Sequence, residues 1–407
     1  MKTTKTLTAL LICALFAVWV LGAVSLPGCS PDPVDNGNGN DNDNGDDNGN
    51  GNGALPDPDP DPGPEPYPDP IPRPQYVRGL YLSGRGAGSA SLREPVLELI
   101  RNSELNAVVV DVKTDDGSVT YIDTEVELAI AAGSNRNDVD MRAFLETLKE
   151  DNIYPIARIV VFKDSRIGAH RPEWAFKDMD GEVWKRGSTI WIDPRNREYW
   201  DYILDLSIEA ALMGFREIQY DYVRWPDGLA HQVPVQDIPP YNLTKDGPFE
   251  RSEVIAEFLA YMAEGLKPYN VEISADIYGL IGRVDHELTV GQQLELLLAS
   301  GLDIICPMMY PGHYADNTYF SGPQNRNPYQ VIYSGTREYL DRMEQAQSAV
   351  ILRPWLQDFN DRDFNYGVKQ IHAQLQALKD QGVKEYLFWN AGNKYTAEAY
   401  KTFSSDD

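Results

Sequence analysis

YWDYILDLSIEAALMGFREIQYDYVRWP, residues 199–226, contains one unit of the pattern that decides the fold. Apolar residues recur at helical spacing from Tyr199 to Met213, and Gly214 follows where a helix is expected to end. Residues 217–222 then form a short run of apolar and aromatic side chains, which is typical of a buried strand. A helix that passes through a glycine into a buried strand predicts an alternating α/β fold.

The same unit recurs along the chain from Tyr76 onward. Short apolar runs predict eight strands, at Val77–Leu82, Ala107–Val112, Tyr154–Val161, Glu217–Tyr222, Glu272–Ile277, Asp303–Met309, Ala349–Trp355 and Glu385–Trp389. Amphipathic stretches between them predict eight helices, at Leu92–Leu105, Met141–Asp151, Tyr199–Met213, Ser252–Leu266, Gln292–Leu298, Gly335–Gln345, Val368–Lys379 and Ala397–Thr402. Eight such units in about 330 residues predict an α/β fold of the (β/α)8, or TIM-barrel, class over residues 75–407.

A doubly wound open sheet is the main alternative fold. Such a sheet usually carries a glycine-rich phosphate loop that opens a helix directly after the first strand. Here the glycines of residues 84–88 are followed by a helix that is expected to begin only near Leu92. We therefore interpret residues 84–88 as a plain loop, and the barrel is the favoured fold.

The first 29 residues predict an export signal. Two lysines precede an almost wholly apolar stretch from Leu7 to Leu26, the usual order of charge and hydropathy in a signal peptide. The stretch ends in Leu26-Pro-Gly-Cys29, which resembles a bacterial lipoprotein box and implies lipidation of Cys29, although Pro27 departs from the residue usual at that place. An uncleaved membrane-spanning anchor is the alternative. Both predict a domain tethered to a membrane and exposed outside the cytoplasm.

Residues 30–74 predict a disordered linker. Asn, Asp and Gly nearly alternate in its first part, and Pro-Asp repeats fill the second, so it has no apolar pattern to bury. Eleven acidic residues and one Arg between residues 31 and 74 give this segment a charge of −10 out of the total of −26. An acidic chain without a basic run is not expected to bind nucleic acid, and its acidity argues against polyanionic substrates.

Polar and aromatic side chains follow the predicted strands at their carboxyl ends. In a TIM barrel these ends form the active-site face. Aromatic rings that stack on the C–H faces of sugars, beside carboxylates that accept hydroxyl hydrogen bonds, favour a carbohydrate ligand. The expected substrate-binding residues are Asp111, Lys113, Arg158, Tyr222, Arg224, Trp225, Tyr278, Tyr310, Trp355, Trp389 and Asn390.

Most of these residues also have an ordinary structural interpretation when each is taken alone. Asp111 is as readily a loop cap or an ion-pair partner as a functional group, and Tyr310 or Trp389 as readily fills the barrel core. Asp221 differs because it lies inside an apolar strand, where burying a carboxylate that has no function is energetically costly.

Several of these segments together resemble a family of bacterial glycoside hydrolases of uncharacterised activity. The resemblance covers the chain from Tyr76 to its end and rests on five segments, which are VRGLY (77–81), NAVVVDVK (106–113), WIDPRN (191–196), EIQYDYVRWP (217–226) and SADIYG (274–279). The family has a TIM-barrel domain and is distantly similar to the α-amylase superfamily. That likeness implies catalytic carboxylates after strands four and five, at Asp221 and Asp276.

The two carboxylates suit a retaining glycosidase. Asp221 is the expected nucleophile, kept ionised by a nearby cation such as Lys113, Arg158 or Arg224. Asp276 is the expected general acid/base, because apolar neighbours would raise its pKa. The expected substrate is an extracellular or cell-envelope poly- or oligosaccharide, and inversion remains open should the two groups lie far apart.

Other classes of function are weighed against this one. A non-catalytic carbohydrate-binding barrel would keep the aromatic residues without needing the acid pair. A zinc hydrolase is disfavoured because none of the five histidines forms a close ligand pair. We expect no cofactor, leave a bound Ca²⁺ open, and expect a monomer whose single barrel cysteine, Cys306, is a buried free thiol.

Overall fold

The computed structural model describes residues 70–229, 232–234, 237–239, 247–361 and 364–404. The predicted signal peptide with Cys29 and nearly all of the predicted linker lie outside these residues. Export, lipidation and linker disorder therefore stay predictions. No helix of the described residues is long and apolar enough to cross a membrane.

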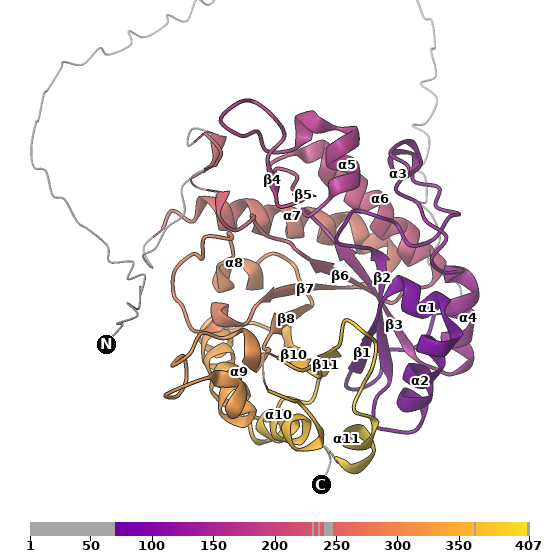
Figure 1. Cartoon of the computed structure of the whole chain (residues 1–407), viewed down its shortest axis with the longest axis vertical. Coiled ribbons are helices and arrows are strands. Elements are labelled where there is room, and N and C mark those ends of the chain that lie inside the picture. Colours follow the sequence, from indigo (N-terminus) through magenta and orange to yellow (C-terminus); the bar gives the residue numbers. More distant parts are fainter. Residues whose placement is uncertain (1–69, 230–231, 235–236, 240–246, 362–363, 405–407) are drawn as a thin grey trace, which may run out of the picture. The chain divides into compact units, whose positions relative to one another are not determined.

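Parallel strands form a closed barrel with helices around it (Figure 1). The strand order is β10-β11-β1-β2-β3-β6-β7-β8-β9, and β10 closes the ring by also pairing with β8. The predicted (β/α)8 TIM barrel is confirmed, with β9 and β10 sharing the seventh strand position. The strands are β1 (Arg78–Leu82), β2 (Ala107–Lys113), β3 (Tyr154–Val160), β6 (Glu217–Asp221), β7 (Glu272–Tyr278), β8 (Ile304–Met308), β9 (Ile351–Leu352), β10 (Trp355–Gln357) and β11 (Tyr386–Trp389).

The seventh strand differs from its prediction as one continuous run at residues 349–355. It is broken at Arg353-Pro354 into β9 and β10, and it extends to Gln357. Pro354 has no N–H to donate to a neighbouring strand, which accounts for the interruption. The break matters for the site, because Trp355 follows it directly.

The predicted helices are all present, with changes at their ends. The glycines expected to be a plain loop instead form the short helix α1, where the Ser83 side chain accepts a hydrogen bond from Gly86 N. Gly214 ends α6 with φ of 115°, a left-handed conformation that glycine adopts without strain. The helices are α1 (Gly84–Gly88), α2 (Ala90–Arg101), α3 (Glu127–Ala131), α4 (Met141–Glu150), α5 (Ser165–His170), α6 (Arg197–Met213), α7 (Glu250–Leu266), α8 (Leu294–Leu298), α9 (Pro328–Gln345), α10 (Val368–Asp380) and α11 (Ala397–Thr402).

Each strand is buried on both faces, and its side chains alternate between two cores. Along β2, Val108 and Val110 pack outward against the helices, while Ala107 and Val109 point into the barrel. The same period of two runs along β6 and β7. It places Asp221 and Asp276 on the inward faces of neighbouring strands, at the ends where those strands finish.

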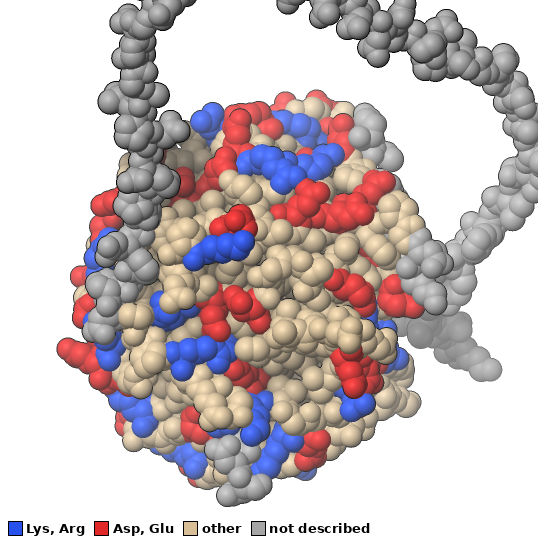
Figure 2. All heavy atoms as spheres, turned by 180° about the vertical axis from the view of Figure 1, so that it is seen from behind, with Lys and Arg blue, Asp and Glu red and all other residues tan. Residues whose placement is uncertain are grey.

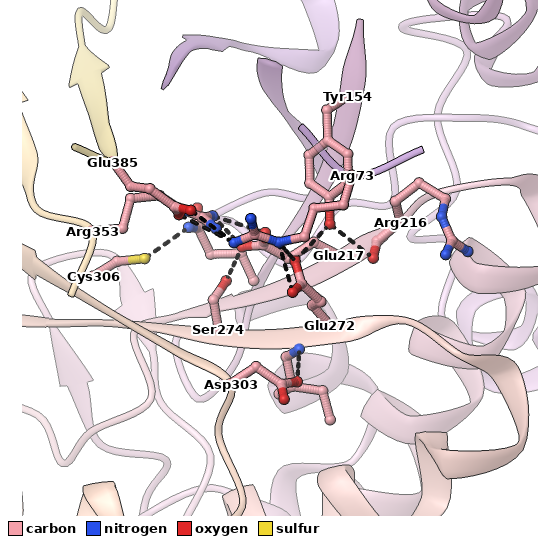
Figure 3. Close-up of polar contacts among 12 residues, drawn as sticks. Arg73, Tyr154, Arg216, Glu217, Glu272, Ser274, Asp303, Cys306, Arg353 and Glu385 are labelled. Carbon is pink, nitrogen blue, oxygen red and sulfur yellow. Dashed lines mark hydrogen bonds and ion pairs between the residues drawn. The ribbon is translucent and has the colours of Figure 1, made fainter. Parts of the chain in front are cut away.

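The opposite end of the barrel interior holds a buried ionic cluster (Figure 3). The Arg353 guanidinium donates to both oxygens of Glu217 at 2.8 Å and to Glu385 at 2.9 Å, with Arg353 and Glu217 fully buried. Arg73 joins the same cluster from the segment before β1, through Glu272 at 2.7 Å and Glu385 at 2.9 Å. The last residues of the predicted linker are therefore fastened across the end where the strands begin.

The outer surface mixes charges of both signs. Figure 2 shows acidic and basic side chains interspersed over one face of the barrel, without a continuous field of either sign. The charged groups at the two ends of the barrel interior are, by contrast, buried.

Candidate active site

A small cavity opens at the carboxyl ends of the strands. It has a volume of about 250 Å³ and is lined by Arg158, Asp221, Tyr222, Arg224, Asp276, Tyr278, Met308, Tyr310, His313, Trp355 and Trp389. Nine of these eleven residues are among those predicted from the sequence, and they come from six successive strand positions of the barrel. The cavity is therefore the candidate active site.

A larger hollow on the outside of the barrel is less suited to chemistry. It measures about 640 Å³ and lies between α3, α5 and α6. Its most distinctive acid, Glu209, already accepts hydrogen bonds from Tyr121 at 2.6 Å, Thr124 at 2.8 Å and Glu125 N at 2.6 Å. That carboxylate holds the loop after β2 in place, so it has no free oxygen for a substrate.

Asp221 ends β6 and is held by an arginine from the neighbouring strand. Arg158 in β3 donates to Asp221 Oδ2 from Nη2 at 2.6 Å and from Nε at 3.0 Å. Asp221 Oδ1 accepts the backbone N–H of Tyr222 at 2.6 Å. The predicted cation beside Asp221 is therefore Arg158, which binds one oxygen of the carboxylate through two N–H groups.

Arg158 is itself fixed from its other side. Its Nη1 donates to Asp111 Oδ1 at 2.5 Å, and Tyr81 OH donates to Asp111 Oδ2 at 2.7 Å. The guanidinium also lies 5.1 Å from the ring centroid of Trp389. Asp111 thus orients Arg158. It does not line the cavity, so the geometry does not favour its predicted direct contact with substrate.

Asp276 in β7 has a different environment. The indole N–H of Trp355 donates to Asp276 Oδ1 at 2.6 Å, and the residue is 3% exposed. Burial raises the pKa of Asp276 well above its usual range, and the Asp221 carboxylate raises that pKa further. The sequence predicted that apolar neighbours raise the pKa of Asp276. The structure adds a second cause, the nearby Asp221 carboxylate.

The two acids lie side by side in the sheet. The parallel pairing of β6 with β7 places Tyr220 opposite Ala275, and the next residue on each strand is an aspartate. Adjacent strands are about 4.8 Å apart. One cavity thus holds an acid paired with arginine and an acid that favours its protonated form.

Aromatic rings surround this pair. Tyr222, Tyr278 and Trp389 are half-buried and keep part of a ring open to the cavity, while Tyr310 and Trp355 are buried beneath it. Tyr222 has φ of 51°, a left-handed conformation that is uncommon for a residue other than glycine. This turn directly after Asp221 carries the chain from β6 into the wall of the cavity.

Lys113 is not at the mouth, so its prediction as a substrate-binding residue is wrong. The pairing of β2 with β3 shifts register between Asp111 and Lys113, which turns Lys113 toward the helix layer. There it is fully buried, with Nζ 2.9 Å from Asp164 and 2.7 Å from Val160 O. A register shift of this kind leaves no signal in the alternation of apolar residues.

Trp225 and Asn390 also lie outside the cavity, contrary to their prediction. Trp225 is 0% exposed, and its indole N–H donates to Arg251 O at 3.1 Å, so its ring has no free face for a sugar. Asn390 donates to the backbone oxygens of Asp358 and Lys394 and thereby shapes the loop after β11. Both residues support the site from outside it.

Three neighbours of the candidate site were not predicted. Tyr81, which orients Asp111, lies at the end of β1 and could have been found by continuing the alternation from Val77. Met308 and His313 line the cavity from β8 and the turn after it. His313 follows a predicted strand in the sequence, but no local pattern predicted that it would line the cavity.

The described residues contain no group of three or more His, Cys, Asp or Glu side chains that could hold a metal ion. Cys306 is a buried free thiol in β8, as predicted, and its pKa is raised by burial.

Comparisons with known proteins identify a family and proteins of similar fold. A family model described as "Putative glycosyl hydrolase domain" matches residues 79–395. No curated protein was found to match the sequence. A hypothetical protein from Ruminiclostridium thermocellum ATCC 27405 is 33% identical, with a TM-score of 0.42, over 48% of this chain and 96% of its own.

Two solved structures share the fold at low identity. The glycoside hydrolase domain of PgaB (BpsB) from Bordetella bronchiseptica is 14% identical, with a TM-score of 0.57, over 81% of this chain and all of its own. The α-L-fucosidase isoenzyme 2 from Paenibacillus thiaminolyticus is 12% identical, with a TM-score of 0.50, over 80% of this chain and 48% of its own. Since the family model spans nearly the whole barrel, the chain belongs to this family of glycosyl hydrolase domains and is a glycosidase.

Proposed function

We propose that the chain cleaves an extracellular or cell-envelope poly- or oligosaccharide by a retaining mechanism, with Asp221 as nucleophile and Asp276 as general acid/base. The observation that carries the proposal is the unequal pair: the Arg158 guanidinium binds Asp221, while burial raises the pKa of Asp276. Retaining glycosidases need one ionised and one protonated carboxyl group flanking the scissile bond.

The two steps follow from these roles. Asp221 attacks the anomeric carbon while Asp276 gives its proton to the departing glycosidic oxygen, which leaves as an alcohol. In the second step Asp276 takes a proton from water, the water oxygen bonds to the anomeric carbon, and Asp221 departs as a carboxylate. Arg158 stabilises Asp221 when it is charged, at the start and at the end of this cycle.

The spacing of the strands supports retention over inversion. Carboxyl groups lie about 5–5.5 Å apart in retaining enzymes and about 6.5–9.5 Å apart in inverting ones. Asp221 and Asp276 follow directly on paired residues of β6 and β7, and neighbouring strands are about 4.8 Å apart. Acids on neighbouring strands lie closer together than acids on strands farther apart around the barrel, and this placement favours retention.

The stereochemistry of the product tests the proposal. Purified protein would be incubated with a panel of envelope and extracellular polysaccharides, and the anomeric protons of the first product would be followed by NMR. We expect the product to appear with the anomeric configuration of the substrate, before slow mutarotation. Initial formation of the opposite anomer would reject the retaining mechanism, and a panel that binds but is never cleaved would favour a non-catalytic binding barrel.

We further propose that the protein is exported and held at the membrane by a lipid on Cys29. Support comes from the sequence alone, where a charged start and an apolar stretch end at Leu26-Pro-Gly-Cys29. We expect wild-type protein to incorporate radiolabelled palmitate in a bacterial host and Cys29→Ser to incorporate none. A wild-type protein that stays in the membrane fraction without incorporating palmitate would point instead to the uncleaved apolar anchor.

A further inference from the structure

A second arginine, Arg224, lies in the wall of the cavity and is enclosed by aromatic rings. Its guanidinium carbon lies 4.9 Å from the ring centroid of Trp191, 5.2 Å from that of Tyr222 and 5.1 Å from that of Tyr278. The Arg224 side chain is only 9% exposed. Rings at this distance favour a cation, and they hold the planar guanidinium in one orientation.

Arg224 uses few of its hydrogen-bond donors. Nη1 donates to Trp225 O at 3.0 Å and lies 3.6 Å from Asp227. Among the described residues, Nε and Nη2 have no hydrogen-bond partner. Because the rings occupy its surroundings, the Nε–Nη2 edge is the part of Arg224 left to bind a ligand, and this edge matches the two oxygens of a carboxylate.

Arg158 provides a contrast within the same cavity. Its Nη1 is taken by Asp111, and its Nε and Nη2 are taken by Asp221. Arg158 is therefore saturated by protein carboxylates and has no edge left for a substrate anion. The two arginines therefore differ in role. Arg158 binds the proposed nucleophile, and Arg224 has an Nε–Nη2 edge that can bind a ligand.

The charge around Arg224 also differs from that of the whole chain. Arg224 and Arg186 both face the single carboxylate of Asp227, which leaves this wall with an excess of one positive charge. Lys163 lies 4.7 Å from the Tyr222 ring and is paired with Asp115, so it adds no net charge to this wall. The overall charge of −26 argued against anionic substrates, but it is a property of the whole chain and does not describe this wall.

We propose that Arg224 forms a subsite for a carboxylate carried by a sugar ring, so that the substrate is an acidic glycan. This inference rests on the proposed glycosidase function and specifies its substrate class. The carboxylate belongs either to a uronic acid or to an acid attached to the ring through an ether. Tyr222 and Tyr278 flank the subsite and are placed to contact the same ring.

The test compares matched polymers that differ only in the acid group. Polyglucuronic acid and carboxymethyl cellulose represent the two sources of carboxylate, and each is compared with its own carboxyl-reduced form. We expect wild-type protein to cleave at least one acid form with a kcat/KM at least about tenfold above that of the reduced form. Equal rates on every matched pair that is cleaved would overturn the inference.

Variants at Arg224 make the test specific to this residue. Arg224→Met should abolish the preference for the acid form, and Arg224→Lys should restore part of it, because lysine keeps the charge but loses the planar fork. A loss in Arg224→Met that is equal on the acid and reduced forms would show that Arg224 only supports Tyr222, and would reject the subsite. If Arg224→Met does not fold, the preference for the acid form is compared between wild type and Arg224→Lys. A smaller preference in Arg224→Lys supports the subsite, and an equal preference rejects it.

A binding measurement tests the carboxylate subsite separately from the proposed glycosidase activity. Calorimetry with glucuronate and with methyl glucoside needs no hydrolysis. Binding of the acid sugar that Arg224→Met loses would support the subsite even if no glycan is ever cleaved. Conversely, cleavage of neutral glycans with retention, and no binding of acid sugars, would keep the glycosidase proposal and reject the carboxylate subsite.

Discussion

We expect Asp221→Asn to lower kcat/KM by at least about a thousandfold on whichever glycan the wild-type protein cleaves. The amide has nearly the shape of the carboxylate, but it cannot form the glycosyl ester. It also leaves the Nε and Nη2 donors of Arg158 facing a neutral group in place of a charged oxygen. The measurement is the initial rate at subsaturating substrate, with folding checked by circular dichroism.

Asp276→Asn should fail in a different way. Loss of the general acid is expected to cost about 10²–10⁴-fold. The loss should shrink on a dinitrophenyl glycoside of the same sugar, because that leaving group departs without protonation. In the wild-type protein, Asp276 acts as an acid only while protonated, so activity should fall as pH rises through its raised pKa. The Asp276→Asn variant should lack this alkaline decline in its residual activity.

A matched control keeps the interpretation specific. Asp123 is an exposed aspartate on the loop after β2, paired with Arg142 at 3.3 Å. Asp123→Asn makes the same chemical change and should leave kcat/KM within about twofold of wild type, since exposed ion pairs contribute little. Full activity in Asp221→Asn would refute the nucleophile, and an unchanged pH profile in Asp276→Asn would refute the acid.

The sequence predicts much of this arrangement because the relevant signals are local. Helical spacing, a glycine at the helix end and an apolar strand can each be recognised within one βα unit, and eight repeats then specify the barrel. The period of two along a strand places Asp221 and Asp276 inward, at the ends of β6 and β7. The fold and the acid pair could therefore be predicted together.

The remaining differences come from contacts between distant residues. Lys113 was expected beside Asp111, but the register shift in β2 turns it toward Asp164. Trp225 stands next to Arg224 in sequence, yet Phe176, Arg195 and Arg251 pack against its ring, which is completely buried. Neither outcome can be obtained from spacing, because each depends on where the chain returns after many residues.

The cluster at the opposite end of the barrel was missed for another reason. Continuing the alternation backward from Asp221 leads through Gln219 to Glu217, so an inward acid could have been inferred there. Its partner Arg353 belongs to the interrupted seventh strand, where the broken pattern concealed which side chains point inward. A buried acid can be predicted from one strand, but its counterion cannot.

This buried pair leads to the largest stability effect that we expect. Arg353→Met should lower the free energy of unfolding by about 3–5 kcal/mol, because it leaves Glu217 charged and enclosed without its counterion. Ser274 would still donate to Glu217, at 2.5 Å, and Arg73 would still hold Glu385. Neither contact replaces the two bonds from Arg353 Nη1. Denaturant unfolding at neutral pH measures the change, with Arg142→Met as an exposed control expected within about 1 kcal/mol of wild type.

Two further measurements identify the buried charge as the cause. Adding Glu217→Gln to Arg353→Met should recover part of the lost stability, since the double variant no longer buries an unpaired carboxylate. Burial already raises the pKa of Glu217, and removal of Arg353 would raise that pKa further. A group with a raised folded-state pKa stabilises the fold most at low pH and loses that contribution as pH rises through the pKa. The deficit of Arg353→Met should therefore shrink on acidification, and a deficit independent of both pH and Glu217 would attribute it to lost packing instead.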